Sequence, residues 1–294
     1  MTAPVVSVRN VRKSFRDVDA LVDVSFDVHE HAIHGLLGRN GAGKTTLLQI
    51  LTGQQWADGG EVSVFGGSPF ENDAVLRDVC FVKESQRYPD DFRVGQVLDA
   101  AAAILPRWDE TFARDLMADF DLPRRRKVKK LSRGMTSALG VVVGLASRAP
   151  LTLFDEPYLG LDAVSRQLFY DRLLADYAEH PRTVVLSTHL IDEVADLVDR
   201  VVVVDGGRIV VDDDAEGLRG RAVTISGRAD SVADVTTGLS VLHHESMGSM
   251  ARSTVDGPLA DAALAAARAA GLSVEPVSLQ QFVVASTTRR KVSS

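Results

Sequence analysis

Patterns typical of strands and helices alternate from residue 5 to about residue 218. This alternation predicts an α/β domain with a doubly wound sheet. Residues 34–38 form a short apolar run that ends in glycine, which predicts a buried strand followed by a loop. Apolar positions at helical spacing in residues 45–51, with Gly53 after them, predict a helix directly after that loop.

Two more apolar runs, residues 151–154 and 183–186, predict strands that lead straight into polar residues. A third predicted strand, residues 201–204, ends in the turn Asp205-Gly206-Gly207. Residues 73–121 have a mostly helical pattern, with an irregular stretch at 83–93 and a break at Pro106.

The pattern changes after residue 218. Short strand candidates at 222–226, 239–243 and 273–277 surround an alanine-rich helix at 259–270, which is entered through Gly257-Pro258 with the proline in the first turn. We expect a main domain over residues 1–218 and a small α+β appendix over 219–294, with residues 287–294 as a frayed tail.

Composition limits the class of protein. The 294 residues are 45% apolar, enough for one large or two ordinary domains. A net charge of -7 disfavours broad binding to nucleic acid. The single cysteine, Cys80, excludes an internal disulfide and is expected to be buried, which fits a reducing compartment. No apolar stretch approaches the roughly 18 residues that cross a bilayer, and the N-terminus has no signal-peptide pattern.

The glycine-rich loop carries the strongest chemical signal. Gly38-Arg39-Asn40-Gly41-Ala42-Gly43-Lys44-Thr45 fits the phosphate-binding pattern G-x-x-x-x-G-K-[ST] between a strand and a helix. The backbone N–H groups and the helix N-terminus should face phosphate oxygens, with Lys44 at the β- and γ-phosphates and Thr45 on Mg²⁺. The predicted phosphate-binding residues are Gly38, Asn40, Gly41, Ala42, Gly43, Lys44, Thr45 and Thr46.

Two carboxylates follow the predicted strand at 151–154. Alternation along a strand sends neighbouring side chains in different directions, so Asp155 should hold Mg²⁺ while Glu156 faces the γ-phosphate as general base. The phosphate loop alone would also admit kinases, GTPases and helicases. No Asn-Lys-x-Asp element for reading guanine is present, which argues against a GTPase.

The segments Leu131-Ser132-Arg133-Gly134-Met135 and Ser187-Thr188-His189 precede and follow these carboxylates. With the phosphate loop, they make residues 5–218 resemble an ATP-binding cassette (ABC) ATPase. The resemblance implies a P-loop NTPase cassette with an antiparallel β subdomain and a helical subdomain. It also implies that Phe15 stacks on adenine, that Asp162 lies in the D-loop, and that His189 contacts the γ-phosphate and positions the attacking water.

The signature around Ser132 predicts a second anion site. A serine before an uncapped helical turn offers its hydroxyl, the Gly134 N–H and the helix dipole as donors. The resemblance implies that two chains pair head to tail, with each ATP between Lys44 of one and Ser132 of the other. A homodimer, or a heterodimer with another cassette, would satisfy this. Arg133 and Met135 replace the usual glycine and glutamine, which is expected to shift affinity.

Cassette proteins usually place a glutamine in the Q-loop, where it touches Mg²⁺ and faces the permease. Counting back ten residues from Val94 puts Glu84 at this position, with Gln86 as the alternative. Glu84 is favoured because a carboxylate is a hard oxygen ligand for Mg²⁺. The basic run at residues 124–130 is read as a solvated loop, with permease or anionic lipid headgroups as the alternative contact.

The function that these motifs favour is the ATP-hydrolysing subunit of an ABC transporter. The chain would bind ATP and Mg²⁺ and drive a separately encoded integral-membrane permease at the cytoplasmic face of the cell membrane. Residues 277–282 are similar to the end of many exporter cassettes and favour export. The alternatives are a soluble cassette acting on ribosomes or nucleic acid, and a binding module without ATPase activity. The single cassette and the acidic balance speak against the first, and an intact catalytic set speaks against the second.

Overall fold

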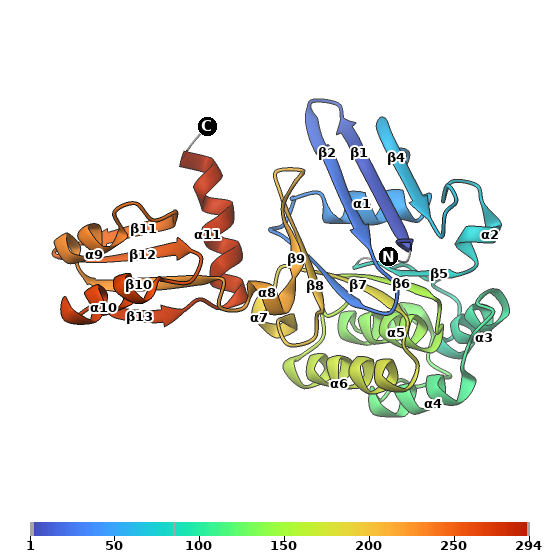
Figure 1. Cartoon of the computed structure of the whole chain (residues 1–294). Coiled ribbons are helices and arrows are strands. Elements are labelled where there is room, and N and C mark those ends of the chain that lie inside the picture. Colours follow the sequence, from blue (N-terminus) through green and yellow to red (C-terminus); the bar gives the residue numbers. More distant parts are fainter. Residues whose placement is uncertain (1–2, 85, 293–294) are drawn as a thin grey trace. The chain divides into compact units, whose positions relative to one another are not determined.

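A computed structural model describes residues 3–84 and 86–292, with side chains described up to residue 287 (Figure 1). The chain divides into two compact units. The first comprises the residues up to His189 together with Val204–Ile209. The second comprises Leu190–Val203 and the residues from Val210 onward.

A parallel sheet forms the centre of the first unit. Four strands of this sheet lie side by side in the following order: β5 (Val79–Val82), β6 (Leu151–Asp155), β7 (Thr183–Thr188) and β3 (Ile33–Leu37). Almost every side chain of β3, β6 and β7 is buried, as expected for a sheet covered on both faces. Leu37 pairs with Thr188, and Asp155 pairs with Ser187. The residues that follow β3, β6 and β7 therefore meet at one edge of the sheet.

A second, antiparallel sheet belongs to the same unit. Its order is β2 (Val18–Val28), β1 (Val6–Phe15) and β4 (Gly59–Val64). On β1, the inward positions Val6, Val8 and Val11 are buried and the residues between them are more exposed, which is the alternation of a strand with one face on the core.

Helices cover the parallel sheet on both faces. Figure 1 shows α1 (Lys44–Leu51) between the two sheets and α5 (Arg133–Ala146) on the opposite side of the parallel strands. The other helices of this unit are α2 (Asp73–Leu76), α3 (Val94–Ile104), α4 (Glu110–Asp119) and α6 (Ala163–Glu179), with a 3₁₀ turn at Val128–Lys130. Strands β8 (Arg200–Asp205) and β9 (Arg208–Asp214) contribute the segment around the turn at Gly206-Gly207 to this unit.

The second unit has a four-stranded antiparallel sheet in the order β11-β12-β10-β13. Its core consists of Ile225, Val232, Ala251, Val255, Ala267 and Leu272. The elements of this unit after β9 are α8 (Ala215–Leu218), β10 (Ala222–Arg228), α9 (Ala229–Thr236), β11 (Val241–Met247), β12 (Met250–Asp256), α10 (Asp261–Ala269), β13 (Ser273–Pro276) and α11 (Leu279–Val292), and α7 (Ile191–Val194) precedes β8.

The structure corrects several predicted elements. Residues 79–82 form β5 rather than part of a helical segment, because parallel pairing with β6 buries this short apolar run. The helix α10 begins after Ala260, so Pro258 precedes it instead of lying in its first turn. The predicted tail is helical through residue 292, and residues 293–294 lie outside the described residues.

The predicted boundary after residue 218 falls inside the second unit as the structure divides the chain. The assignment of residues 1–218 and 219–294 to separate functional domains stays a prediction. Among the described residues, no helix is long and apolar enough to cross a membrane.

Candidate functional site

The glycine loop between β3 and α1 is closely packed on neighbouring backbone. Gly43 has φ of 109°, and a Cβ there would lie 2.5 Å from the carbonyl oxygen of Ala20, so only glycine fits. The buried Lys44 turns its Nζ back to the Gly38 and Arg39 carbonyl oxygens, at 2.8 and 3.2 Å. The lysine is thus held inside the loop, where a phosphate group would take over these contacts.

Asp155 lies at the end of β6 and faces the first turn of α1. Its carboxylate accepts hydrogen bonds from the Thr45 hydroxyl at 2.7 Å and from the Ser187 hydroxyl at 2.9 Å. Burial raises the pKa of Asp155, and the two hydroxyl donors act in the opposite direction. The structure therefore joins two of the three predicted Mg²⁺ ligands, Thr45 and Asp155, directly.

Glu156 directly follows β6. Its φ is 50°, in the left-handed region that a non-glycine residue adopts at a cost. The buried carboxylate places Oε1 3.3 Å from Lys44 Nζ and Oε2 2.8 Å from His189 Nδ1. Oε2 also accepts a hydrogen bond from the Tyr158 hydroxyl. The proposed base, Lys44 and His189 are thus brought together at one point.

A cavity of about 260 Å³ opens over the glycine loop. Its lining joins Asn40–Thr46 of the loop to Val18, Glu84 and Glu156. Gln86 lines another cavity, so the structure places Glu84 and not Gln86 beside the phosphate loop. Phe15 is exposed at the tip of the β1–β2 hairpin, with Lys13 Nζ 5.2 Å from its ring centroid. Its predicted stacking on adenine stays a prediction.

The signature serine sits at the N-terminus of α5. Contrary to the expected uncapped turn, the Ser132 hydroxyl oxygen accepts a hydrogen bond from the Met135 N–H at 3.2 Å. This leaves its hydroxyl proton for an outside acceptor. A Cβ at Gly134 would lie 2.7 Å from the Gly160 carbonyl oxygen, so a side chain there would push α5 off the neighbouring loop. In that loop Asp162 caps α6 by accepting from the Ser165 N–H, which lowers the pKa of Asp162.

Among the described residues, Ser132, Gly134 and Asp162 do not line the cavity at the glycine loop. Arg133, between Ser132 and Gly134, lies 3.9 Å from Glu84, which does line this cavity. The basic run is partly neutralised: Arg124 pairs with Asp99 and Glu110, and Lys127 and Lys129 pair with Asp91.

Sequence reasoning did not assign roles to Ser187, Thr188 and Tyr158. Ser187 and Thr188 end β7 and could have been found from their place at the same sheet edge as the carboxylates. The Tyr158 contact depends on the turn after β6, which has no signature in the sequence.

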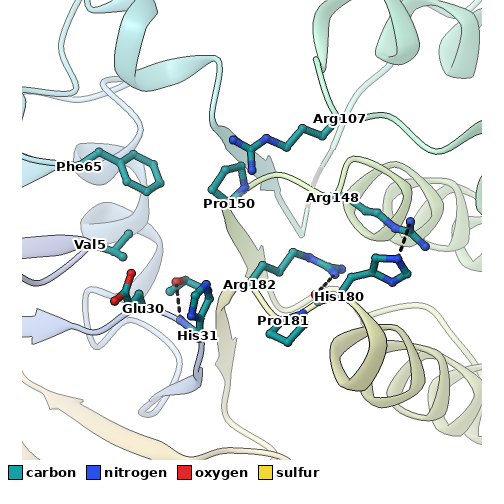
Figure 2. A pocket seen from close by; sticks show the side chains of 11 residues that line it. Val5, Glu30, His31, Phe65, Arg107, Arg148, Pro150, His180, Pro181 and Arg182 are labelled. Atoms are coloured by element: carbon teal, nitrogen blue, oxygen red, sulfur yellow. Dashed lines mark hydrogen bonds between the residues drawn. The ribbon is translucent and has the colours of Figure 1, made fainter. Parts of the chain in front are cut away.

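A different cavity, of about 410 Å³, is lined mostly by residues just before or at the start of strands, together with Phe65 after β4 and Arg107 between α3 and α4 (Figure 2). Three arginines line it, Arg107, Arg148 and Arg182. Asp176 pairs with two of them: Arg182 Nη1 lies 2.5 Å and Arg148 Nη2 3.0 Å from its carboxylate. Figure 2 shows the Arg148 guanidinium beside His180, at 3.2 Å. The predicted site residues do not include any of its lining, so this cavity is not part of the nucleotide site.

Comparisons with known proteins agree with this geometry. The ABC transporter family matches residues 21–159, and a family described as "AAA domain, putative AbiEii toxin, Type IV TA system" matches residues 124–195. The "Doxorubicin resistance ATP-binding protein DrrA" of Mycobacterium tuberculosis is 32% identical over 225 residues, which is 74% of this chain and 68% of that protein. The chain belongs to the ABC transporter ATP-binding proteins. It is the ATP-binding subunit of an ABC transporter and an ATPase of this class.

Other relatives differ in what their names say of transport. The "ABC transporter ATP-binding protein YtrB" of Bacillus subtilis is 29% identical over 67% of either chain. The "Aliphatic sulfonates import ATP-binding protein SsuB 3" of Rhodococcus jostii is 34% identical over 75% of this chain and 83% of its own. A solved structure titled "Structure of ATP binding subunit of ABC transporter" has a TM-score of 0.65 at 24% identity, over 73% of this chain and 91% of its own. This likeness confirms the predicted P-loop cassette fold.

Proposed function

We propose that two copies of this cassette, or this cassette and a second one, bind Mg²⁺–ATP between them and drive a separately encoded membrane permease, in the direction of export. The observation that carries the catalytic part is the convergence of Lys44, Glu156 and His189 at one edge of the sheet. The proposal assigns the chain to the cytoplasmic face of the cell membrane.

The proposed reaction needs a base beside the γ-phosphate. A water oxygen forms a bond to the γ-phosphorus while its proton passes to the Glu156 carboxylate. The bond from the γ-phosphorus to the bridging oxygen breaks, and its electron pair stays on ADP. Lys44, released from its contacts with the loop and with Glu156, neutralises the phosphate charge. His189, already 2.8 Å from Glu156, lies where it can orient the water.

The donor set at Thr45 and Asp155 fits Mg²⁺. Both side chains offer hard oxygen atoms, and because burial raises the pKa of Asp155, a bound cation would favour its ionised form. No group of three or more His, Cys, Asp or Glu side chains that could hold a metal occurs in the part of the chain that the structure describes. This agrees with an ion bound partly by nucleotide phosphates, whose negative charge it neutralises when bound.

Pairing of two cassettes would complete the site. Ser132 and Gly134 present donors at the N-terminus of α5 and do not line the cavity over the glycine loop of their own chain. Head-to-tail pairing would bring these donors to the phosphates held by the partner's loop. In a symmetric dimer this contact would occur twice, once at each of the two nucleotides.

An apolar cavity of about 320 Å³ between β5 and α3 supports docking of a permease segment. Phe92 and Ile104 on its rim are exposed, and Gln86 supplies a polar group. A short amphipathic segment of the permease could place apolar side chains here, next to Glu84 in the nucleotide cavity. Glu84 and Gln86 would then link the two sites, because each lines one of the two cavities.

The catalytic part is tested by hydrolysis in Glu156→Gln, which keeps the shape of the side chain and removes the base. We expect turnover to fall by roughly 10² to 10⁴-fold, with ATP binding retained. A variant that hydrolyses ATP within threefold of the parent would show that Glu156 is not the base.

Permease docking is tested by photo-crosslinking in membranes of the source cells. A photoreactive residue at Ile104 should crosslink to a multispanning membrane protein, whereas one at Val164, an equally exposed apolar position on α6, should not. Crosslinks to ribosomal protein or RNA from Ile104 would favour the soluble cassette instead. For the direction of transport, loss of the chain should raise sensitivity to toxic compounds if it exports. A growth defect cured by excess nutrient would indicate import.

A further inference from the structure

Tyr158 lies in the turn between β6 and α6, two residues after Glu156, and its side chain is only 2% exposed. The turn is tight: the Leu159 N–H donates to the Glu156 carbonyl oxygen at 3.1 Å. This geometry brings the phenol back onto the Glu156 carboxylate. We propose that Tyr158 is a positioning residue that fixes one oxygen of Glu156 and thereby aims the other at the attacking water, with Thr188 holding the tyrosine in place.

The hydrogen bonds have a definite direction. An ionised carboxylate only accepts, so the single hydroxyl proton of Tyr158 goes to Glu156 Oε2. The Thr188 hydroxyl, 2.6 Å from the Tyr158 oxygen, must then donate to it, and the His189 backbone N–H also points there at 3.4 Å. Burial and the bond to Glu156 raise the pKa of Tyr158, so the phenol stays a proton donor at neutral pH.

The two oxygens of Glu156 consequently have different surroundings. Oε2 is held by Tyr158 and by His189 Nδ1, whereas Oε1 faces Lys44 Nζ at 3.3 Å. When Lys44 turns to the phosphates of ATP, Oε1 is the oxygen left to receive the proton of water. Without the tyrosine hydroxyl, the carboxylate could rotate and its basic oxygen would spend less time aimed at the γ-phosphate.

This inference rests on the proposed role of Glu156, and the test separates the two. In Tyr158→Phe we expect kcat for ATP hydrolysis to fall by about 10- to 100-fold, the range for a lost hydrogen bond to a charged group, with KM within about twofold of the parent. Tyr170→Phe removes another buried tyrosine hydroxyl, on α6 away from the site, and should keep the parent's kcat. In a Glu156→Gln background, Tyr158→Phe should have no further effect, because the group through which it acts is gone.

Thr188→Val gives a second route that leaves the phenol in place. It should lower kcat less than Tyr158→Phe and have no effect in a Tyr158→Phe background, and Thr188→Ser should restore the parent rate. A kcat of Tyr158→Phe within twofold of the parent, or the same loss in the Glu156→Gln background, overturns the positioning role alone. A parent without Mg²⁺-dependent hydrolysis, or an active Glu156→Gln, overturns this role and the proposed base together.

Discussion

At the edge of the parallel sheet, the side chains expected to bind phosphate and metal are paired with carboxylates of the same chain. Without nucleotide, Lys44 contacts Glu156, and Thr45 contacts Asp155. In each contact, a carboxylate is the partner of a side chain that would bind phosphate or metal. Binding of nucleotide would therefore exchange one partner of Lys44 and Thr45 for another. The same atoms become available to phosphate and metal when these internal contacts are exchanged.

Asp155 should make stability depend on pH in a specific direction. Because its folded pKa is raised, the ionised carboxylate destabilises the folded chain at neutral pH, and this cost disappears as the pH falls through the folded pKa. We expect Asp155→Asn to raise the melting temperature of the nucleotide-free protein at neutral pH, with a smaller gain in acid. Thermal unfolding of both proteins over a pH series measures this. An asparagine variant that melts below the parent at neutral pH would contradict it.

Glu84 gives a prediction on metal dependence. Its carboxylate lines the nucleotide cavity, and its nearest ion-pair partner is Arg133 at 3.9 Å. We expect Glu84→Gln to keep most of the hydrolysis rate and to raise the Mg²⁺ concentration needed for half-maximal activity, since a neutral amide attracts the ion less. Gln86→Ala, at the neighbouring cavity, is the control. If only the Gln86 variant shifts the Mg²⁺ requirement, the assignment of Glu84 to the Q-loop is wrong.

Among the secondary structure elements, the packing of β5 can be tested through its single cysteine. Its Cys80 is buried, and burial raises the pKa of this thiol to about 11. We expect no reaction with a thiol reagent at pH 8 in the native protein and full reaction after denaturation. Native labelling at the rate of a free thiol would mean that β5 does not stay paired with β6.

The strand β5 was not predicted from the sequence, whereas other parts of the site were. The phosphate loop, α1 and the strands β3, β6 and β7 were predictable because buried parallel strands are apolar runs bounded by functional residues. The run Val79–Val82 is as long as most of the predicted runs but lies inside a segment of mostly helical pattern, and its pairing with Leu151–Phe154 makes it a strand. The carboxylates were predictable from their place after a strand, whereas the Tyr158 contact depends on a turn whose φ angles the sequence does not specify.

For the whole molecule, the account requires that one chain is incomplete as an enzyme. The glycine loop and the carboxylates lie at one site, while the donors of Ser132 and Gly134 lie outside its cavity. The C-terminal sheet has its own apolar core and contributes none of the residues assigned to the nucleotide. The account therefore predicts that hydrolysis requires pairing through the signature helix.

The solution mass of Glu156→Gln with Mg²⁺–ATP, measured by light scattering during size-exclusion chromatography, tests this most directly. Because the variant holds ATP without cleaving it, we predict the mass of two chains with nucleotide and of one chain without it. Adding Ser132→Arg should return the mass with nucleotide to that of one chain, since the larger side chain would block the phosphates. A Glu156→Gln protein that binds Mg²⁺–ATP and remains a single chain at high protein concentration would contradict the composite site.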